Sequence, residues 1–376
     1  MRVALVVPGG VDRTGEYRVI PALLALLSRL ARAHDVDVFA LAQEAQAGEW
    51  PLAGAHIHNI GLHHTRIRAL RAIMARHSLS PFDLVHAIWS GSCGVVAVAA
   101  GALLRIPSLV HVAGGELVAL PEIDYGGGLT WRGRVREQIT LRMASAVTAP
   151  SAPTIGALAA LGVSAQRVPL GVDLGVWPPR EPAPRDPGKS ARLIHVASLN
   201  RVKDQTTLLR ALAVLTQMGV ECHLDIVGED TLAGEIQALA RELGLSDRVA
   251  FHGFLPQRLL RPLVEIAHLL VVSSRHETGP LVTLEAAVAG VPTVGTSVGH
   301  IAEWAPHAAV AVPVGEAVAL AEAIGSLLAD EELRLAIARE AQRRAILDDA
   351  DHTVQRVETI YASLVGSSGR QHGEPQ

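Results

Sequence analysis

Residues 269–295 read LLVVSSRHETGPLVTLEAAVAGVPTVG, and they contain the most informative secondary-structure pattern of the chain. The apolar run 269–272 predicts a buried parallel strand. A loop follows it, and residues 281–289 then predict a short apolar helix. Gly290 and Pro292 end that helix, and residues 293–295 form the next predicted strand. Strands that alternate with helices in this way predict a parallel α/β sheet.

Two carboxylates mark the loop and the helix of this stretch. Seven residues separate Glu277, in the loop, from Glu285, within the helix. Backbone N–H groups near residues 280–282 have no intrahelical partner, and a helix start of this kind attracts phosphate. A sugar diphosphate would fit both features. A plain loop-to-helix turn with one capping and one solvated glutamate is the alternative, although the Gly-Pro turn at 279–280 and the Ala-Gly-Val-Pro exit at 289–292 make the string more specific.

The whole string resembles the E-x7-E motif of retaining glycosyltransferases of the GT-B fold, in family 4 (glycosyl transferases group 1). In that family the first glutamate contacts the donor sugar and the second contacts the ribose of the nucleotide. The resemblance implies these roles for Glu277 and Glu285. It also places five residues near the sugar and the phosphates: Thr278, Gly279, Pro280, Leu281 and Val282. The fold that it implies is α/β, with two Rossmann-like parallel-sheet domains facing across a cleft.

The length and composition of the chain limit the classes of protein to which it can belong. Its 376 residues are too many for one ordinary domain, which predicts two. Aromatic residues make up 3%, which argues against a carbohydrate-binding module built on Trp and Tyr. The two cysteines, Cys93 and Cys222, lie far apart, and a reducing, cytoplasmic setting is expected. No signal peptide and no run of about 18 apolar residues is visible, so we expect no membrane span.

Charge is distributed unevenly along the chain. The net charge is −4, but residues 1–175 hold 15 Arg and Lys against 12 Asp and Glu, or +3, and the remainder holds 18 against 25, or −7. The basic N-terminal half indicates an anionic or membrane-borne substrate, or a chance surface bias. Two basic amphipathic stretches, 66–77 and 131–136, indicate peripheral contact with a membrane or two solvated helix faces. The negative net charge argues against nucleic-acid binding.

The first glycine turn is a candidate ligand site. In the N-terminal half we expect strands at 2–7, 37–41, 82–86, 107–112 and 146–149, and a helix at 20–33. Gly9 and Gly10 follow the first strand, and ligands of parallel sheets bind at the carboxyl ends of strands. Their backbone is therefore predicted to approach a phosphate or a sugar, with a plain turn as the alternative.

The family resemblance is weaker in this half. It implies that His86, at the end of the strand 82–86, lines the cleft. Many family members carry His-Gly-x-Asp where this chain has residues 113–116, which makes Gly114 and Glu116 candidate substrate-binding residues. Ala113 stands at the histidine position, and His111 lies two residues earlier. We assign no catalytic histidine because of this departure.

The domain boundary is predicted from composition and from the resemblance. Residues 168–173 resemble the family's Pro-x-Gly-Val-Asp segment, which closes the first domain. We therefore expect an acceptor-side domain at 1–175, a proline-rich linker at 176–191 and a nucleotide-sugar-binding domain at 192–350. A C-terminal helix at 351–365 would cross back to the first domain, and a Gly/Ser-rich tail at 366–376 would be disordered.

A rare lysine follows the first strand of the second domain. Among 33 basic residues only Lys189 and Lys203 are lysines, and a compact ammonium past a strand end suits a phosphate, although chance placement is the alternative. The family pattern is Gly-Arg-x-x-x-x-Lys, whose basic residues bind the donor diphosphate. Lys203 matches it, whereas Ser198 stands at the arginine position, and Arg201 is close enough to compensate. By resemblance, Gly253 and Phe254 lie against the nucleotide base.

These features predict a retaining glycosyltransferase that moves a sugar from a nucleotide-diphosphate sugar to a glycan, lipid-linked or small-molecule acceptor. Lys203 and the helix start near Pro280 would stabilise the leaving diphosphate, and Glu277 would position the sugar. No metal or other cofactor is expected. Two alternatives remain, a sugar-nucleotide 2-epimerase and a catalytically inactive binding or scaffold protein. The departures at Ala113 and Ser198 favour the inactive protein, and the intact glutamate pair opposes it.

Overall fold

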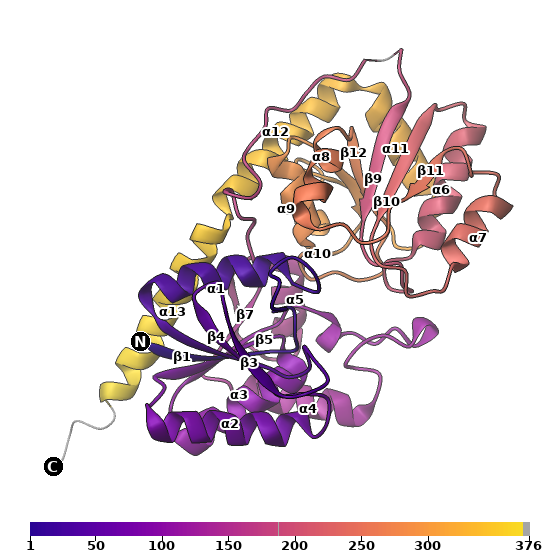
Figure 1. The fold of residues 1–376 in the computed structure, drawn as a ribbon. Helices are drawn as coiled ribbons and strands as arrows, with labels where there is room; N and C mark the ends of the chain where they lie inside the picture. The colour runs from indigo at the N-terminus through magenta and orange to yellow at the C-terminus, as the bar shows by residue number, and fades with distance from the viewer. Residues whose placement is uncertain (187, 371–376) are drawn as a thin grey trace. The chain divides into compact units, whose positions relative to one another are not determined.

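The computed structural model describes residues 1–186 and 188–370 of the chain (Figure 1). It divides into two compact units, one comprising Met1–Gly171 with the chain from Ala350 onward and the other comprising Val172–Asp349. Each unit has a central, mainly parallel sheet covered by helices on both faces. The predicted α/β class with two Rossmann-like domains is confirmed.

Unit 1 is built on an eight-stranded sheet with the order β3-β4-β2-β1-β5-β6-β7-β8. All neighbouring strands are parallel except β3, which pairs antiparallel with β4 at one edge. The strands are β1 (Arg2–Val7), β2 (Asp35–Ala40), β3 (Gly48–Leu52), β4 (Ala55–Asn59), β5 (Leu84–Ile88), β6 (Ser108–His111), β7 (Ala146–Ala149) and β8 (Gln166–Arg167).

The helices of unit 1 cover the two faces of this sheet. They are α1 (Pro21–Ala33), α2 (Thr65–Leu79), α3 (Val95–Leu104), α4 (Trp131–Met143), α5 (Ala152–Ala160) and α13 (Ala350–Arg370). Apolar residues of α1 and α13 share one core with the sheet, and those of α2 to α5 share the other. In α1 the leucines 23, 26, 27 and 30 recur at helical spacing and are all buried, which fixes the face that it turns to the sheet.

Unit 2 has a six-stranded parallel sheet with the order β11-β10-β9-β12-β13-β14. Its strands are β9 (Ala191–Val196), β10 (Cys222–Val227), β11 (Val249–Phe251), β12 (Leu269–Val272), β13 (Thr293–Thr296) and β14 (Val310–Val312). Its helices are α6 (Gln205–Gln217), α7 (Glu235–Glu242), α8 (Gln257–Glu265), α9 (Leu281–Val288), α10 (Gly299–Trp304), α11 (Ala317–Ala329) and α12 (Glu331–Leu347). The stretch 269–295 forms β12, α9 and the start of β13, as predicted.

The proline-rich segment predicted as a linker is attached to unit 2. The Arg180 amide donates to the Val288 carbonyl at 3.0 Å, and the Arg185 amide donates to Glu331 Oε1 at 2.7 Å. The buried Arg334 guanidinium donates to the Ala183 carbonyl at 2.7 Å. Proline removes amide donors but leaves carbonyls available, so an extended proline-rich segment can still be fixed along a surface.

The C-terminal helix α13 belongs to unit 1, where it packs on α1. Arg29 Nε lies 2.5 Å from Asp351 Oδ1, and His34 Nε2 lies 3.1 Å from Glu358 Oε1. The helix runs to Arg370, so residues 366–370, predicted as part of a disordered tail, are helical, and residues 371–376 lie outside the described residues. Glycine and serine are poor helix formers, but each costs at most about 1 kcal/mol, which a formed helix tolerates.

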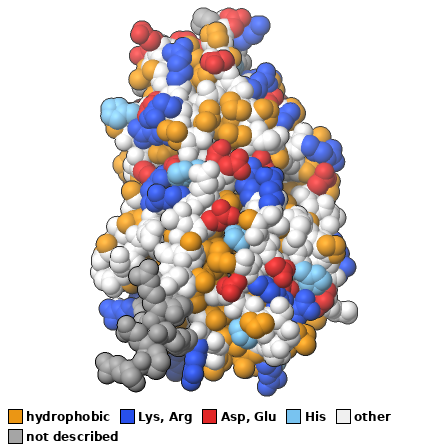
Figure 2. Space-filling model, turned by 90° about the vertical axis from the view of Figure 1, so that its left-hand side faces the viewer, with side chains coloured by type: hydrophobic (Ala, Val, Ile, Leu, Met, Phe, Trp, Pro, Cys, Tyr) orange, Lys and Arg blue, Asp and Glu red, His pale blue; other side chains and the backbone are white. Residues whose placement is uncertain are grey.

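The surface carries charges of both signs. On the face drawn in Figure 2, Lys and Arg side chains are interspersed with Asp and Glu side chains. Across residues 1–186 and 188–370, none of the helices combines the length and the apolar character that a membrane crossing requires.

Gly228→Ala is expected to prevent unit 2 from folding. Gly228 follows β10 with φ of +154°, and a Cβ atom there would lie 1.9 Å from the Ala197 carbonyl oxygen. The backbone conformation and the clash both oppose any side chain. Circular dichroism melting should show loss of cooperative unfolding for that unit. Gly325→Ala is the matched control, because its nearest neighbours lie 3.6 Å away, and an unchanged melt for Gly228→Ala would contradict the prediction.

Candidate active site

The candidate active site of unit 2 lies where its strand order reverses. The order runs outward from β9 through β10 and β11 on one side, and from β12 through β13 and β14 on the other. In parallel α/β sheets, ligands bind at such a point, outside the carboxyl ends of the two neighbouring strands, which here are β9 and β12. Lys203 follows β9 and Glu277 follows β12. The topology therefore brings together two side chains that are 74 residues apart.

Lys203 and Glu277, the two predicted catalytic residues, are in direct contact. Lys203 Nζ lies 2.5 Å from Glu277 Oε1, which also accepts a hydrogen bond of 2.7 Å from Ser274 Oγ. The Lys203 side chain is 25% exposed and that of Glu277 is 13% exposed, so the pair is shielded but reachable. Asn200 Oδ1 and Ser273 Oγ hold the Lys203 backbone from both sides, through its amide at 3.1 Å and its carbonyl at 2.8 Å.

The loop after Glu277 leads directly into the start of α9. Pro280 is the N-cap residue with an extended backbone, so the helix begins at Leu281, and the Leu281 and Val282 amides are among those that a helix start leaves without an intrahelical acceptor. The next amide, that of Thr283, donates to the Pro280 carbonyl at 3.1 Å. Thr278 is buried, and a Cβ atom at Gly299 would lie 3.0 Å from the Thr278 carbonyl oxygen. The start of α10 therefore packs closely against the loop 278–280, and Gly279 lies within this loop.

Glu285 is buried inside α9 and is 4% exposed. Its Oε1 atom accepts a hydrogen bond of 2.6 Å from Gln257 Nε2 of α8. Burial raises the pKa of the Glu285 carboxyl to about 8, because no cation offsets the loss of water. The carboxyl is therefore largely protonated at neutral pH and can donate as well as accept a hydrogen bond. Sequence reasoning missed Gln257, which lies 28 residues away and carries no local signal.

Arg201, predicted to compensate for Ser198 at the arginine position, is paired with an acid of α7. It forms a bidentate ion pair with Glu235 at the start of α7, with both N–O distances at 2.7 Å. Arg275 is the arginine that joins the Lys203 loop, since its amide donates to the Val202 carbonyl at 2.7 Å. Its guanidinium pairs with Asp204 at 3.2 Å. The sequence offered one indication of this role, because Arg275 lies two residues before Glu277 in the stretch 269–295.

The remaining predicted residues of unit 2 lie on loops after β9 and β11. Ser198 is exposed, and its carbonyl accepts from Gln205 Nε2 at 3.1 Å. Gly253 has φ of +66°, and its carbonyl accepts from the Gly228 amide at 2.8 Å. Phe254 is 45% exposed. These three positions surround the carboxyl edge of the sheet, where the resemblance expects the nucleotide.

The Gly9-Gly10 turn of unit 1 is already hydrogen-bonded within the protein. Gln43 Oε1 accepts from the Gly10 amide at 2.6 Å and from the Val11 amide at 3.0 Å. Gly10 has φ of +81°, and a Cβ atom there would lie 2.5 Å from the Ile20 side chain. The structure thus explains the second glycine by the turn itself, which was the alternative considered.

His86 is buried in the core of unit 1, in the interior of its strand and not at the strand end that the sequence predicted. It is 1% exposed, and its Nδ1 atom lies 2.7 Å from the Tyr361 hydroxyl of α13. Burial lowers its pKa to about 3, with the nearby His111 adding to the effect, so the ring is neutral. The strand β5 continues to Ile88, which places His86 in mid-strand beneath α13.

Glu116 closes a loop instead of facing outward. Its Oε2 atom accepts from the Gly114 amide at 2.7 Å, and its Oε1 atom accepts from the Ser90 amide at 3.1 Å. Burial raises its pKa despite these bonds. Sequence reasoning missed Glu137, a buried carboxyl on α4 whose pKa burial raises to about 7, helped by the charge of Glu116. Glu137 is the one acidic residue of an arginine-rich helix, and this isolated position could have indicated it from the sequence.

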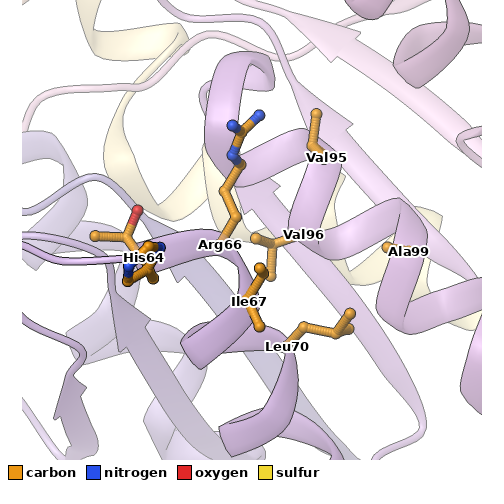
Figure 3. A pocket seen from close by; sticks show the side chains of 8 residues that line it. His64, Arg66, Ile67, Leu70, Val95, Val96 and Ala99 are labelled. Carbon is orange, nitrogen blue, oxygen red and sulfur yellow. The ribbon is translucent and has the colours of Figure 1, made fainter.

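A pocket of about 510 Å³ lies in unit 1 between the start of α2 and α3 (Figure 3). It is lined by His64, Thr65, Arg66, Ile67, Leu70, Val95, Val96 and Ala99, none of which was a predicted site residue. Ile67 and Val96 lie next to each other in Figure 3, and the Arg66 guanidinium extends away from them. The pocket is therefore mainly apolar, with polar groups at its margin.

Known proteins resemble the chain in both sequence and structure. N-acetyl-alpha-D-glucosaminyl L-malate synthase of Bacillus anthracis is 32% identical over 178 residues, which cover 46% of this chain and 45% of that protein. D-inositol 3-phosphate glycosyltransferase of Corynebacterium urealyticum is 30% identical over 190 residues, covering 46% and 44%. The chain thus aligns with about half the length of these curated relatives.

Two solved structures share its architecture over almost the whole chain. Sucrose-phosphate synthase from Thermosynechococcus elongatus superposes with a TM-score of 0.78 at 18% identity, covering 98% of this chain and all of that one. HepE of Anabaena, in complex with UDP and glucose, superposes with a TM-score of 0.75 at 21% identity, covering 97% and 100%. The likeness shows the GT-B fold.

Two family models cover most of the sequence. The model described as glycosyl transferase 4-like domain matches residues 19–171, and the model described as glycosyl transferases group 1 matches residues 180–344. The matches correspond to units 1 and 2, and the second contains Lys203, Glu277 and Glu285. The chain belongs to the group 1 glycosyltransferases, family 4.

Proposed function

We propose that the chain transfers a sugar with retention of anomeric configuration from a nucleotide-diphosphate sugar to a glycan, lipid-linked or small-molecule acceptor, without a metal. The observation that carries this proposal is the contact between Lys203 and Glu277, 2.5 Å apart where the strand order of unit 2 reverses and next to the start of α9. Unit 2 would bind the donor and unit 1 the acceptor.

The metal-free mechanism rests on two sources of positive potential. In the transition state, negative charge develops on the leaving diphosphate. The Lys203 ammonium and the Leu281 and Val282 amides at the start of α9 would stabilise that charge in place of a divalent ion. Lys203 would exchange part of its contact with Glu277 for a phosphate oxygen when donor binds. Glu277 would then accept hydrogen bonds from the sugar hydroxyls and orient the ring, and it would not act as a nucleophile.

Glu285 would contact the ribose as a neutral acid. Its carboxyl is mainly protonated at pH 7 because it is buried, so it can donate to one ribose oxygen while Gln257 holds its other oxygen. This also avoids a second negative charge beside the diphosphate. The ribose and the diphosphate of the donor would thus be bound by different residues, Glu285 and Lys203.

Calorimetric titration with UDP, GDP, ADP and their glucose conjugates tests the donor site. UDP-glucose is tried first because HepE, a structural neighbour, holds UDP and glucose. We expect one nucleotide diphosphate to bind, and Glu285→Ala to weaken it. Proton NMR of the product then reports the anomeric configuration. Absence of binding to every nucleotide would refute the donor site, and an inverted product would refute retention.

The two alternative functions find no support in the comparisons. The relatives are named as a synthase and as glycosyltransferases, and the matching family models describe glycosyl transferases. Incubation with donor alone distinguishes them, because an epimerase isomerises the sugar without acceptor and an inactive protein leaves it unchanged.

We also propose that α4 rests on an anionic membrane surface. Four apolar side chains recur at every fourth position of this helix and are 45–64% exposed: Trp131, Val135, Ile139 and Met143. Four exposed arginines flank them, Arg132, Arg134, Arg136 and Arg142, and the only acid of the helix, Glu137, is buried. An exposed apolar stripe bordered by cations alone suits the headgroup region of an anionic bilayer.

Sedimentation with vesicles tests this contact. We expect the chain to bind phosphatidylglycerol vesicles, to release at 0.5 M salt and to ignore phosphatidylcholine vesicles, because charge draws the helix to the surface. The double variant Val135→Ser with Ile139→Ser should lose most binding. Leu259→Ser, which alters an equally exposed leucine of α8 in unit 2, should not. Equal binding by the double variant would refute the role of α4. The cytoplasmic location stays a prediction.

A further inference from the structure

The edge hairpin of unit 1 gathers two histidines and a glutamate on one face. His56 and His58 are two residues apart on β4, so their side chains point to the same side of the sheet. Glu49 of β3 pairs directly with His58 in the antiparallel register, which places it on that side too. The turn between these strands fixes this register, so the hairpin itself assembles the three groups.

The separations among these groups suit a small metal ion. His58 Nδ1 lies 2.9 Å from Glu49 Oε1, and His56 Nε2 lies 3.2 Å from Glu49 Oε2. One ligand atom from each of the three residues lies within 4.8 Å of the other two. Ligands at about 2.0–2.1 Å from a tetrahedral zinc ion are roughly 3.3 Å apart, so only a small adjustment of the exposed Glu49 and His56 side chains is needed.

A second shell orients His58 for coordination. Its other nitrogen, Nε2, lies 2.6 Å from Oδ1 of the buried Asp37 and therefore carries the proton that it donates. Asp37 is held in turn by Arg2 Nη2 at 2.6 Å and Arg76 Nη2 at 3.3 Å. The Phe39 ring stacks on His58 with centroids 4.9 Å apart. Nδ1 faces the Glu49 carboxylate, and on ion binding it would give up its proton and coordinate the ion, as in carboxylate–histidine–metal arrangements.

We propose that Glu49, His56 and His58 bind a zinc-class divalent ion, with water in the remaining position. Two imidazoles and one carboxylate suit zinc and its transition-metal neighbours, whereas Mg²⁺ and Ca²⁺ prefer oxygen ligands. The side chains of Glu49 and His56 are 58% and 43% exposed, so an ion can enter from solvent. The ion would fasten the edge strand β3 to the sheet. This site is in unit 1 and is independent of the donor chemistry proposed for unit 2.

Titration of the untagged, chelator-treated full chain with ZnCl₂ tests this site. We expect one saturable equivalent by calorimetry, and visible absorption bands of tetrahedral Co²⁺ when CoCl₂ is used as the probe. Glu49→Gln and His56→Asn should each weaken zinc binding by about tenfold or more. Both side chains are exposed, so the fold should survive, which circular dichroism verifies. The control is His63→Asn with His64→Asn, a neighbouring exposed histidine pair, which should bind as wild type does.

Three results would overturn the proposal. The first is no saturable zinc binding at micromolar concentration, which would leave the cluster as a set of ion pairs. The second is unchanged affinity in Glu49→Gln and His56→Asn. The third is loss of binding in the His63/His64 control, which would assign the ion to that pair. A melting temperature that zinc raises in wild type but not in Glu49→Gln would support the proposed fastening of β3, since an ion that binds only the folded state stabilises it.

Discussion

Lys203→Ala is expected to lower the transfer rate by about 10²–10³-fold, the usual loss when one group that stabilises transition-state charge is removed. Lys203 is the ammonium in contact with Glu277 beside the start of α9, and it is the matching basic residue of the diphosphate pattern. The donor is the nucleotide sugar that titration identifies. The rate is measured at saturating donor, so that weaker binding does not account for the loss.

Binding measurements separate a charge role from a structural one. Lys203→Ala should weaken the binding of a nucleoside diphosphate far more than that of the matching nucleoside, because only the diphosphate carries the phosphates that Lys203 is proposed to contact. Glu277→Gln should also lower the rate, and the double variant should lose less than the two single losses combined, since the side chains share one contact. Melting curves recorded in parallel exclude a general loss of fold.

The other lysine of the chain is the matched control. Lys189 has a side chain that is 79% exposed and lies 3.5 Å from Asp186. Lys189→Ala removes the same charge from unit 2 and should leave the rate and the diphosphate affinity unchanged, because surface ion pairs contribute little. Equal effects of the two substitutions, or a fully active Lys203→Ala, would show that Lys203 has no part in the reaction.

The sequence predicted helices and strands well where particular residue types set their ends. Gly290 and Pro292 end α9, and the apolar run before Glu277 is β12, because turn residues and buried strands have local causes. The contact between Lys203 and Glu277 could not be derived in this way. It depends on β9 and β12 being neighbours in the sheet, and strand order is a property of the whole chain.

The partners that the sequence did not reveal are distant along the chain. His86 looked like a strand end, but β5 continues to Ile88 and a hydroxyl from Tyr361, 275 residues away, meets it in the core. Arg201 was expected near the donor and pairs with Glu235 at the start of α7. No periodicity reveals which surface carboxylate an arginine will reach, whereas burial patterns do reveal helices and strands.

Glu285→Gln is expected to stabilise unit 2, and more so as the pH rises. Burial raises the pKa of this carboxyl to about 8 from the ordinary value of 4.5. Ionising it is therefore harder in the folded state than in the unfolded state, and stability falls as pH rises from about 4.5 to about 8. The glutamine side chain of the variant does not ionise. The substitution therefore removes a destabilising contribution to folding of about 4 kcal/mol at pH 8 but only about 1 kcal/mol at pH 5.

Chemical unfolding of both proteins at pH 5 and pH 8 measures this difference. Glu242→Gln is the control, because it makes the same change at an exposed position of α7 and should leave stability nearly unchanged at both pH values. A stabilisation by Glu285→Gln that is equal at the two pH values would contradict the protonation argument. Since Glu285 is also the proposed ribose contact and would act there as a neutral donor, Glu285→Gln should keep nucleotide binding whereas Glu285→Ala should weaken it. Weaker nucleotide binding by Glu285→Gln would instead show that the ribose contact needs the ionised carboxylate, and that the chain keeps a destabilising buried acid for its function.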